Sequence, residues 1–402
     1  MAKPVHSRIE LKFSDGEILT GWKQLSFREN YREPLPRMTV TLSPPNAQLL
    51  ELKRRLGKGR EFTFHIAGAQ QARMVTIGTR IRHGVAGSTL TLSAAGILYT
   101  AMNAKADWRY HKRTVEDVPL QQTVLELLEP FGFDFISGDS IANLTTLTGR
   151  PLNPGTVQPL PIATLKGKDV QIKPGDHVYQ KAAELVGRLG FRLAITANGV
   201  LLIDSPHFSL PPRYTVQMGG VVQGDNIQGD AEEVDTNEGQ FSEYVIEGKA
   251  ADRKGSKTAT PPVNGVAIKG AKRSEPYKDT KLFEAPRGRH HYYGEGRHEV
   301  CAYYEEHPKA NTIKHCQAVG VTRMGASGPE AYQLVTPLTG FVSRSGGGIW
   351  AVNTTGRVVV PALGIDETMW VYAREFTADE QGGEAVKLTW LPLGALTLGG
   401  ST

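Results

Sequence analysis

Residues 363–392 read LGIDETMWVYAREFTADEQGGEAVKLTWLP and contain the pattern that decides the fold. Apolar and polar side chains alternate over Met369–Phe376 and again over Glu384–Leu391, and a turn from Asp379 to Gly383 separates the two stretches. Alternation with a period of two is typical of strands that bury one face. Further strands are expected upstream at Tyr332–Leu338, Ile349–Asn353 and Arg357–Val360. The sequence therefore predicts an all-β region from residue 318 onward.

The N-terminal part of the chain shows the same alternation. Residues 8–13 and 17–28 alternate around Ser14-Asp15-Gly16, which indicates a hairpin with an Asp-Gly turn. A short helix is expected around residues 46–56 and further strands at Leu35–Leu42, Glu61–Ile66, Arg73–Arg82 and Ser88–Ser93. Five or six strands within 100 residues predict a small antiparallel β-barrel over residues 1–100.

The middle of the chain has a different pattern. Apolar residues recur at helical spacing over Pro119–Glu129 and again from Asp176, a candidate N-cap, to Leu189. The Asn198-Gly199 pair between two apolar stretches is the strongest hairpin signal in the chain. Residues 101–212 are therefore predicted to form an α/β domain inserted between two all-β regions.

Charge divides the remaining sequence. The net charge is +5, yet Tyr214–Gly248 contains eight acidic residues and no Lys or Arg, whereas Lys249–Lys314 contains 14 basic and 8 acidic residues. Residues 213–248 with 318–402 are predicted to form a second small antiparallel β-barrel. Residues 249–317 are expected to be a basic insertion with a short helix over Glu295–Glu306.

The predicted fold class is thus mainly β with an α+β middle domain: two barrels separated by an inserted α/β domain. The change from period-two spacing to helical spacing and back is the basis for this division. If the division is right, the two β regions form separate sheets. A single continuous sheet through both would contradict it.

Composition limits the class of protein. The chain has 402 residues, of which 40% are hydrophobic and 22% charged, as in a soluble globular protein of several domains. No run approaches the roughly 18 apolar residues of a membrane span, so no stable membrane insertion is expected. No apolar leader follows Met1, and two cysteines cannot form a disulfide framework, so we expect the protein to be made in a cytoplasm.

The common catalytic and cofactor motifs are absent from the sequence. There is no Walker A loop and no Gly-x-Ser-x-Gly elbow, and Gly346-Gly347-Gly348 lies between expected strands, which favours a turn over a phosphate cradle. His298, Cys301, His315 and Cys316 come nearest to a metal site. Because adjacent His315 and Cys316 cannot readily both bind one tetrahedral ion, we expect no metal. Because the catalytic and cofactor motifs are missing as well, we expect no cofactor and no enzyme activity.

The order of the C-terminal motifs resembles a known family. Gly346-Gly347-Gly348 leads into Ile349–Asn353, Leu363–Asp366 turns into Met369-Trp370-Val371, and Asp379–Gly383 turns into Val386–Pro392. This order is similar to the end of the baseplate hub proteins of contractile-tailed, Mu-like phages, the tail proteins of the late control gene D group.

The middle of the chain resembles the same family. Pro174-Gly175-Asp176, the helix that ends at Leu189-Gly190-Phe191, and the turn at Asn198-Gly199 are similar to the family's middle domain. The resemblance covers most of the chain outside residues 138–174 and 249–290.

The resemblance implies a structural role. In this family two tail-tube-like β-barrels per chain assemble as a homotrimer, which joins the sixfold tail tube to the threefold central spike and encloses the DNA channel. The implied partners are the spike protein and the tail tube or a distal tube-adaptor protein, with tape measure and baseplate wedge proteins as further candidates. The implied location is the tail baseplate of a virion.

Two other functions remain open. The chain could be a hub or spike-base component of a type VI or extracellular contractile injection system, which would share the fold. A virion-associated cell-wall hydrolase is the second alternative, although it would need an acid/base or zinc site that the sequence does not offer. A nucleic-acid-binding protein with sequence specificity is disfavoured, because the basic residues lie in one insertion without regular aromatic interleaving.

In a hub, the acidic segment has an expected place. Carboxylates around a channel would keep passing DNA from adhering, since cations that neutralise phosphates add affinity. The candidate channel-facing residues are Asp225, Asp230, Glu232, Glu233 and Asp235.

Overall fold

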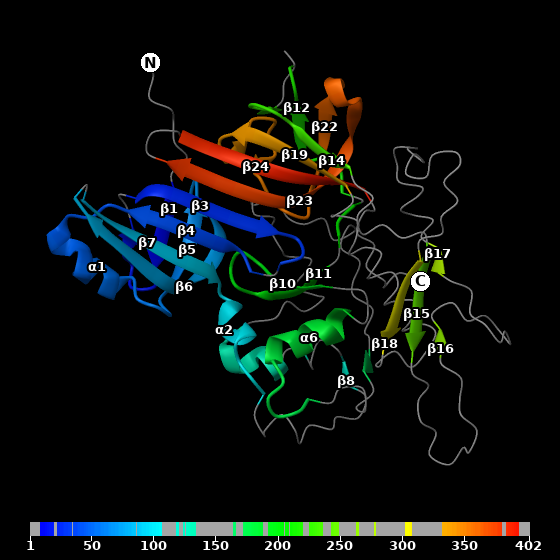
Figure 1. Ribbon diagram of the computed structural model, residues 1–402, viewed down its shortest axis with the longest axis horizontal. Coiled ribbons are helices and arrows are strands. Elements are labelled where there is room, and N and C mark those ends of the chain that lie inside the picture. Colours follow the sequence, from blue (N-terminus) through cyan, green and yellow to red (C-terminus); the bar gives the residue numbers. More distant parts are fainter. Residues whose placement is uncertain are drawn as a thin grey trace.

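A computed structural model gives the three-dimensional structure of the chain (Figure 1). It describes residues 9–19, 22–33, 35–85, 87–106, 118–119, 124, 126–133, 164–165, 172–187, 192–204, 206–208, 210–219, 225–235, 243–248, 263–264, 277–278, 302–307, 332–379 and 383–393.

The described chain is mainly β, and most of its strands belong to one 14-stranded, largely antiparallel sheet. These strands are β1 (Ile9–Phe13), β2 (Ile18–Leu19), β3 (Trp22–Asn30), β4 (Arg37–Leu42), β5 (Glu61–Ile66), β6 (Ala69–Gly84), β7 (Gly87–Gly96), β12 (Tyr214–Gln217), β13 (Asp225–Asn226), β14 (Glu232–Asp235), β19 (Tyr332–Thr339), β22 (Thr355–Val360), β23 (Ile365–Asp379) and β24 (Gly383–Pro392).

The other elements are shorter or lie outside that sheet. The helices are η1 (Asn46–Gln48), α1 (Leu49–Arg55), α2 (Tyr99–Met102), η2 (Glu129–Phe131), α6 (Val178–Gly187) and η5 (Pro361–Leu363). The remaining strands are β8 (Val118–Pro119), β9 (Thr164–Leu165), β10 (Arg192–Ile195), β11 (Leu201–Asp204), β15 (Glu243–Gly248), β16 (Val263–Asn264), β17 (Tyr277–Lys278), β18 (Ala302–His307), β20 (Val342–Ser343) and β21 (Gly348–Ile349).

The first β region, β1 to β7, confirms the strands expected near the N-terminus. Its strand order is β3-β4-β7-β6-β5-β1-β2, and every neighbouring pair is antiparallel. The Asp-Gly turn forms as predicted: the Phe13 N–H donates to the Glu17 carbonyl at 2.8 Å, and Gly16 adopts a φ of 85°. Helix α1 is the predicted short helix, and Leu49 and Leu56 are buried against the sheet.

The second β region, β12 to β14 and β19 to β24, contains the strands expected at Tyr332–Leu338, Arg357–Val360, Met369–Phe376 and Glu384–Leu391. The strand expected over Ile349–Asn353 is wrong beyond Ile349, because only Gly348–Ile349 (β21) is a strand. The long strand β23 lies between β22 and β24 and is antiparallel to both. Strand β12 is parallel to β22 and to β13, whereas β14 is antiparallel to β19.

The two β regions form one continuous sheet, so the expectation of separate sheets is wrong. One edge of β23 pairs with β22 along Ile365–Trp370 and then with β3 of the first region along Ala373–Asp379, and an irregularity between Val371 and Ala373 marks the change of partner. β23 is 15 residues long, so it extends past β22 and covers the edge of β3 that would otherwise be unpaired. Alternation in the sequence shows which face of a strand is buried, but not which strand covers its edge.

The sheet does not close into a barrel through continuous strand pairing in the described residues. A single isolated bridge, Ile227 with Leu338, brings the edge at β13 back toward β19. The Gln228 N–H also donates to the Pro337 carbonyl at 2.8 Å.

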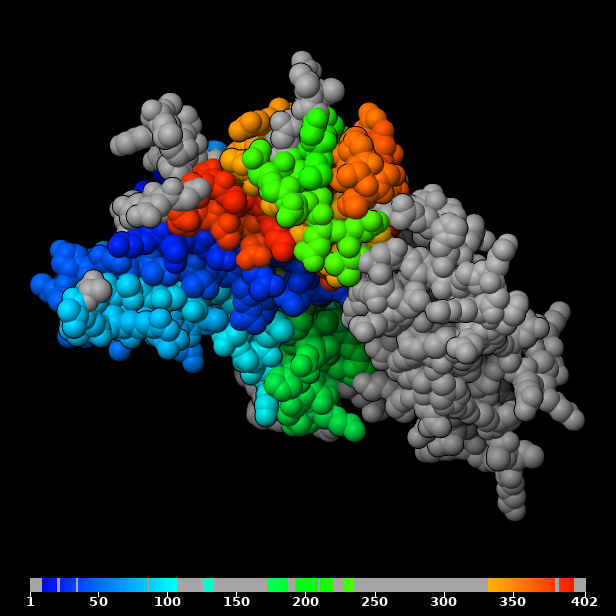
Figure 2. All heavy atoms as spheres, turned by 45° about the horizontal axis from the view of Figure 1, so that its top comes forward, coloured from blue at the N-terminus to red at the C-terminus, as the bar shows by residue number. Residues whose placement is uncertain are grey.

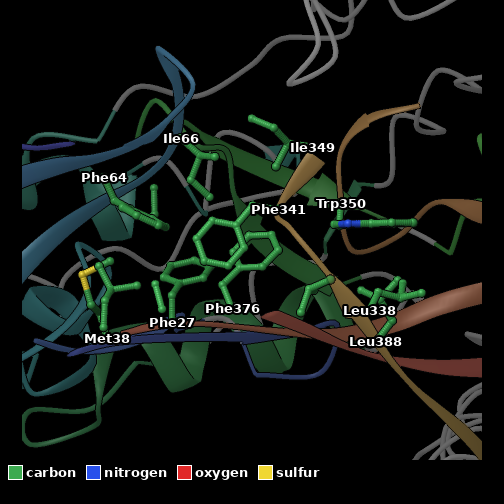
Figure 3. Close-up of a cluster of buried hydrophobic side chains, with 14 of the residues drawn as sticks. Phe27, Met38, Phe64, Ile66, Leu338, Phe341, Ile349, Trp350, Phe376 and Leu388 are labelled. Atoms are coloured by element: carbon green, nitrogen blue, oxygen red, sulfur yellow. The ribbon is translucent and has the colours of Figure 1, made fainter. Parts of the chain in front are cut away.

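One hydrophobic core extends through both β regions (Figure 3). Phe27 of β3 lies 4.9 Å from Phe64 of β5 and 6.1 Å from Phe376 of β23, measured between ring centroids. Phe376 in turn lies 4.7 Å from Phe341. The aromatic side chains of the first and second regions therefore pack against one another.

The middle of the chain has a second hydrophobic core. It combines buried side chains of α2 and α6, the β10–β11 hairpin and residues 124–133. The predicted hairpin is confirmed, and Gly199 adopts the expected positive φ of 86°. The helix expected over Pro119–Glu129 is present at Val124 and at residues 126–128, whereas Pro119 belongs to β8, which pairs with β9.

The segment around residues 243–307 differs from expectation. β15 was expected in the second barrel, but it pairs with β16, β17 and β18 from the basic insertion. The predicted helix over Glu295–Glu306 is wrong for residues 302–306, which belong to β18, parallel to β15. Tyr303 and Tyr304 favour a strand once a partner is available, and that partner lies about 60 residues away in sequence. Residues 295–301 lie outside the described residues.

Candidate functional site

The acidic segment lies at the edge of the second β region. Asp225 of β13 pairs with Val216 of β12. The chain then turns through Gly229, which has a φ of 88°, and enters β14. β14 pairs with β19, so that Asp235 lies opposite Tyr332. In Figure 2 these light-green residues are on the visible surface beside the red strands β23 and β24.

The five predicted acidic residues do not share one face. Glu232 and Asp230 are exposed, whereas Glu233 is half-buried and accepts a hydrogen bond of 3.0 Å from the Tyr332 hydroxyl. Successive side chains of a strand point to opposite sides, so Glu232 and Glu233 diverge. For Asp225 and Asp235 the structure places the backbone only. It thus gathers these residues beside β19 without aligning all of them.

A buried arginine joins the two β regions and was missed by the sequence analysis. The side chain of Arg374 on β23 is 1% exposed, and its guanidinium bonds Glu29 of β3 at 2.7 Å. It also donates to Gln71 of β6 at 3.0 Å and to the Trp350 carbonyl. The sequence contained one indication of this role. Arg374 is two residues before the core residue Phe376, so both side chains point to the same face of the strand. A charge at a core-facing position requires buried partners.

A polar cluster joins the middle of the chain to the second β region. Asp204, at the end of β11, is 8% exposed and accepts a hydrogen bond of 3.0 Å from the Asn353 side-chain amide. Arg192 and His207 approach the same carboxylate at 3.5 and 3.4 Å. Asn353 also accepts hydrogen bonds from Trp370 Nε1 and the His207 N–H, at 3.0 and 2.8 Å, so it fixes β23 relative to the β10–β11 hairpin.

Tyr31 extends this cluster to the end of β3. The centre of its ring lies 3.7 Å from Arg192 Cζ, under the guanidinium group, and 4.8 Å from the centre of the Trp370 ring. Burial raises the pKa of the Tyr31 hydroxyl above its ordinary value, and the Asp204 carboxylate raises it further, against an opposing effect of Arg192. The hydroxyl therefore stays neutral at physiological pH.

The triple glycine forms a turn, as predicted, and joins β20 to β21. A Cβ on Gly347 would collide with the Tyr214 ring and the Arg213 carbonyl. Tyr214 is buried, and its hydroxyl donates to the Ile349 carbonyl and accepts from the Ala351 N–H, both at 2.9 Å. The glycine is thus required by close packing, and the turn fixes β12 against the segment that follows β21.

Sites for chemistry are limited in the part of the chain that the structure describes. No group of three or more His, Cys, Asp or Glu residues there could hold a metal ion. His298, Cys301, His315 and Cys316 lie outside the described residues. Within the same described ranges, no helix has the length and apolar character needed to cross a membrane.

Comparison with known proteins identifies the fold. No family model and no curated protein matches the chain. Among solved structures, a 43 kDa tail protein of prophage MuSo2 from Shewanella oneidensis is similar over 97% of this chain and 99% of its own, with a TM-score of 0.68 and 16% identity. A tail protein from Neisseria meningitidis matches over 98% of both chains, with a TM-score of 0.68 and 13% identity.

A third similar structure comes from a secretion system. It is an Escherichia coli component of the type VI secretion system, described as structurally similar to two bacteriophage T4 tail proteins. The similarity covers 96% of this chain and 78% of the E. coli chain. Its TM-score is 0.50 and its identity 9%. The chain therefore has the fold of Mu-like prophage tail proteins along nearly its whole length, as the sequence resemblance indicated.

Proposed function

We propose that this chain is a structural baseplate hub of a phage contractile tail. In this role it is a trimeric adaptor that joins the sixfold tail tube to the threefold central spike and encloses the DNA channel. The observation that carries the proposal is the end-to-end match to a prophage tail protein and a second tail protein, which spans at least 97% of this chain. The 14-stranded sheet and the hydrophobic core that both β regions share suit a scaffold.

The two β regions are the proposed tube-like domains. Residues 1–100 supply the first and residues 213–248 with 318–402 the second, with residues 101–212 between them and residues 249–317 as an insertion. Within these bounds β15 (Glu243–Gly248) goes with the insertion, because it pairs with β16, β17 and β18. Three chains would then present six tube-like domains around one channel. The continuous pairing of β3 with β23 supports a fixed angle between the two domains of each chain, which a pseudo-sixfold ring requires.

The acidic segment is proposed to border the channel. Asp230, in the turn before β14, and Glu232 of β14 are exposed at the edge of the second region, as a channel border requires. Asp225 belongs to β13, and Glu233 and Asp235 belong to β14. Carboxylates there would repel phosphates, so DNA would pass without adhering. Because Glu232 and Glu233 point to opposite sides of β14, only one of them can face the channel directly.

The proposed partners follow from this role. They are the central spike protein and the tail tube or a distal tube-adaptor protein, with tape measure and baseplate wedge proteins as further candidates. The proposed location is the tail baseplate of the virion, after assembly in the host cytoplasm. An adaptor of this kind works through its contacts with partner proteins, and it needs no catalytic residue or cofactor.

A hub in a type VI or extracellular contractile injection system is the second candidate. The similarity to the E. coli type VI secretion component, with a TM-score of 0.50, favours it over a cell-wall hydrolase. The phage hub and the injection-system hub differ in cargo, so particles purified with the chain would contain DNA in one case and none in the other.

The test of the main proposal is the mass of the purified chain, alone and with a candidate trimeric spike protein. We expect a homotrimer of the 43.8 kDa chain that binds one spike trimer. A stable dimer or a sixfold homomer in the assembled tail would overturn the proposal.

A further inference from the structure

One end of the first β region combines exposed apolar and basic side chains. We call this the basic end: the β1–β2 hairpin, helix α1 with the loop to Arg60, and the β6–β7 hairpin from Arg80 to Ser88. Four large hydrophobic side chains are exposed in the described chain, and three of them, Ile18, Leu50 and Val85, belong to the basic end. Exposed apolar side chains that gather at one place are typical of an interaction surface.

Polar contacts tie the parts of the basic end together. Arg60, after α1, pairs with Glu17 at 2.9 Å and with Asp15, so the β1–β2 turn lies against the end of the helix. On the other side, the Ser88 hydroxyl at the start of β7 donates to Asn46 just before α1, at 2.6 Å. The three parts therefore form one surface around α1.

The basic end carries five exposed cations without an ion pair in the described residues, and Glu51 of α1 is exposed among them. Lys53, Arg54, Lys58, Arg80 and Arg82 are exposed. None of these five forms an ion pair with any residue that the structure describes, whereas Arg60 is already paired. The unpaired cations lie on the same elements as the exposed side chains of Leu50 and Val85, or next to them, and outnumber Glu51, so an occupant of this surface should carry carboxylates.

The complementary charges are in the second β region. Asp230 and Glu232 are exposed and form no ion pair within the described ranges. Figure 1 shows β14 over the far half of the sheet, away from α1. One chain cannot bring these two surfaces together, but two chains can.

We propose that the basic end of one copy docks on the Asp230–Glu232 edge of a second copy. This inference rests on the proposed function and names the contact that holds the ring together. The contact joins two different surfaces, so it is head-to-tail and generates a closed ring where the rotation permits. It places Asp230 and Glu232 at the seam between copies, paired with cations, and leaves Asp225, Glu233 and Asp235 as the channel-facing candidates. A nucleic acid at the basic end would leave Ile18, Leu50 and Val85 in water, which disfavours that occupant.

The first test uses the unmodified chain. Zero-length carbodiimide cross-linking is applied to an equal mixture of unlabelled and isotope-labelled protein, followed by peptide mass spectrometry. We expect cross-links from Lys53 or Lys58 to Asp230 or Glu232 that join labelled and unlabelled copies. Lys181 and Glu184, 3.5 Å apart on α6, are the control and should cross-link within one copy only. Control cross-links without the inter-copy product, in a protein that is trimeric, would overturn the docking.

The second test reverses the charges. We expect Arg80→Glu with Arg82→Glu to weaken self-association about tenfold or more, and Asp230→Lys with Glu232→Lys to do the same. Combining all four substitutions in one chain should restore association, because opposite charges then meet again. If the trimer forms with unchanged affinity in every variant, the docking is refuted and the hub proposal stands. If the wild-type chain remains monomeric at all concentrations, the hub proposal itself fails.

Discussion

Replacing Arg374 with methionine tests whether the buried arginine holds the two β regions together. Methionine fills much of the same volume but leaves Glu29 without its cation, and the Gln71 side-chain oxygen and the Trp350 carbonyl lose a donor. The substitution changes no strand pairing, so a loss of stability reports on these contacts.

The magnitude follows from burial. Breaking a buried ion pair by removing one partner costs about 3–5 kcal/mol. The side chain of Glu29 is 29% exposed and can regain some hydration, so we expect the lower end of this range, about 3 kcal/mol. A typical domain has about 5–15 kcal/mol of stability, so the loss is a large fraction of the total.

The assay is urea unfolding of the full chain followed by tryptophan fluorescence. Trp350 and Trp390 are fully buried in the core that both regions share, and Trp370 is fully buried against Tyr31 after β3, so their emission reports on contacts between the regions. The Arg357 and Asp366 pair, with side chains 57% and 56% exposed, supplies the matched control, and Arg357→Met should change the unfolding midpoint little.

A double variant separates the ion pair from simple packing. Arg374→Met with Glu29→Met removes both charges, and we expect it to be more stable than Arg374→Met alone because no unpaired carboxylate remains. The reasoning is refuted if Arg374→Met unfolds within about 1 kcal/mol of the wild type, the scale of an exposed pair.

Three further predictions concern the core, the glycine turn and the buried tyrosines. Phe376→Ala should cost about 3–5 kcal/mol in the same urea assay because it leaves a cavity between the two regions, and a cost below about 1 kcal/mol would show that the regions do not share a core. Gly347→Ala should lower the melting temperature measured by circular dichroism, since its Cβ would collide with Tyr214 and Arg213, whereas Gly84→Ala, which meets open space, should not. Burial raises the pKa of Tyr31, and raises that of Tyr179 to about 12, so stability should be complete below the unfolded value near 10 and be lost as the pH rises through the folded values. Melting temperatures at increasing alkaline pH check this, and Tyr31→Phe should reduce the loss; an identical pH dependence in that variant would contradict the assignment.

The sequence by itself determined the local elements. Period-two alternation located β3, β7, β22 and β24, and the Asp-Gly and Asn-Gly pairs located two turns, because side-chain direction and positive φ depend on neighbouring residues only. The ordered motifs of the C-terminal third also indicated the tail-protein fold, which the end-to-end structural similarity confirms.

Only the tertiary structure decided how these elements combine. The pairing of β3 with β23 joins residues more than 340 positions apart, and the buried partners of Arg374 come from three separate segments. Likewise, residues 302–307 became a strand through pairing with β15. The acidic segment was visible as composition, but the division of Glu232 and Glu233 between two sides of β14 required the register with β19. Edge pairing, burial of a charge and strand register depend on which distant segments meet. Alternation along one segment shows which side chains are buried, but it does not identify the segments that pack against them.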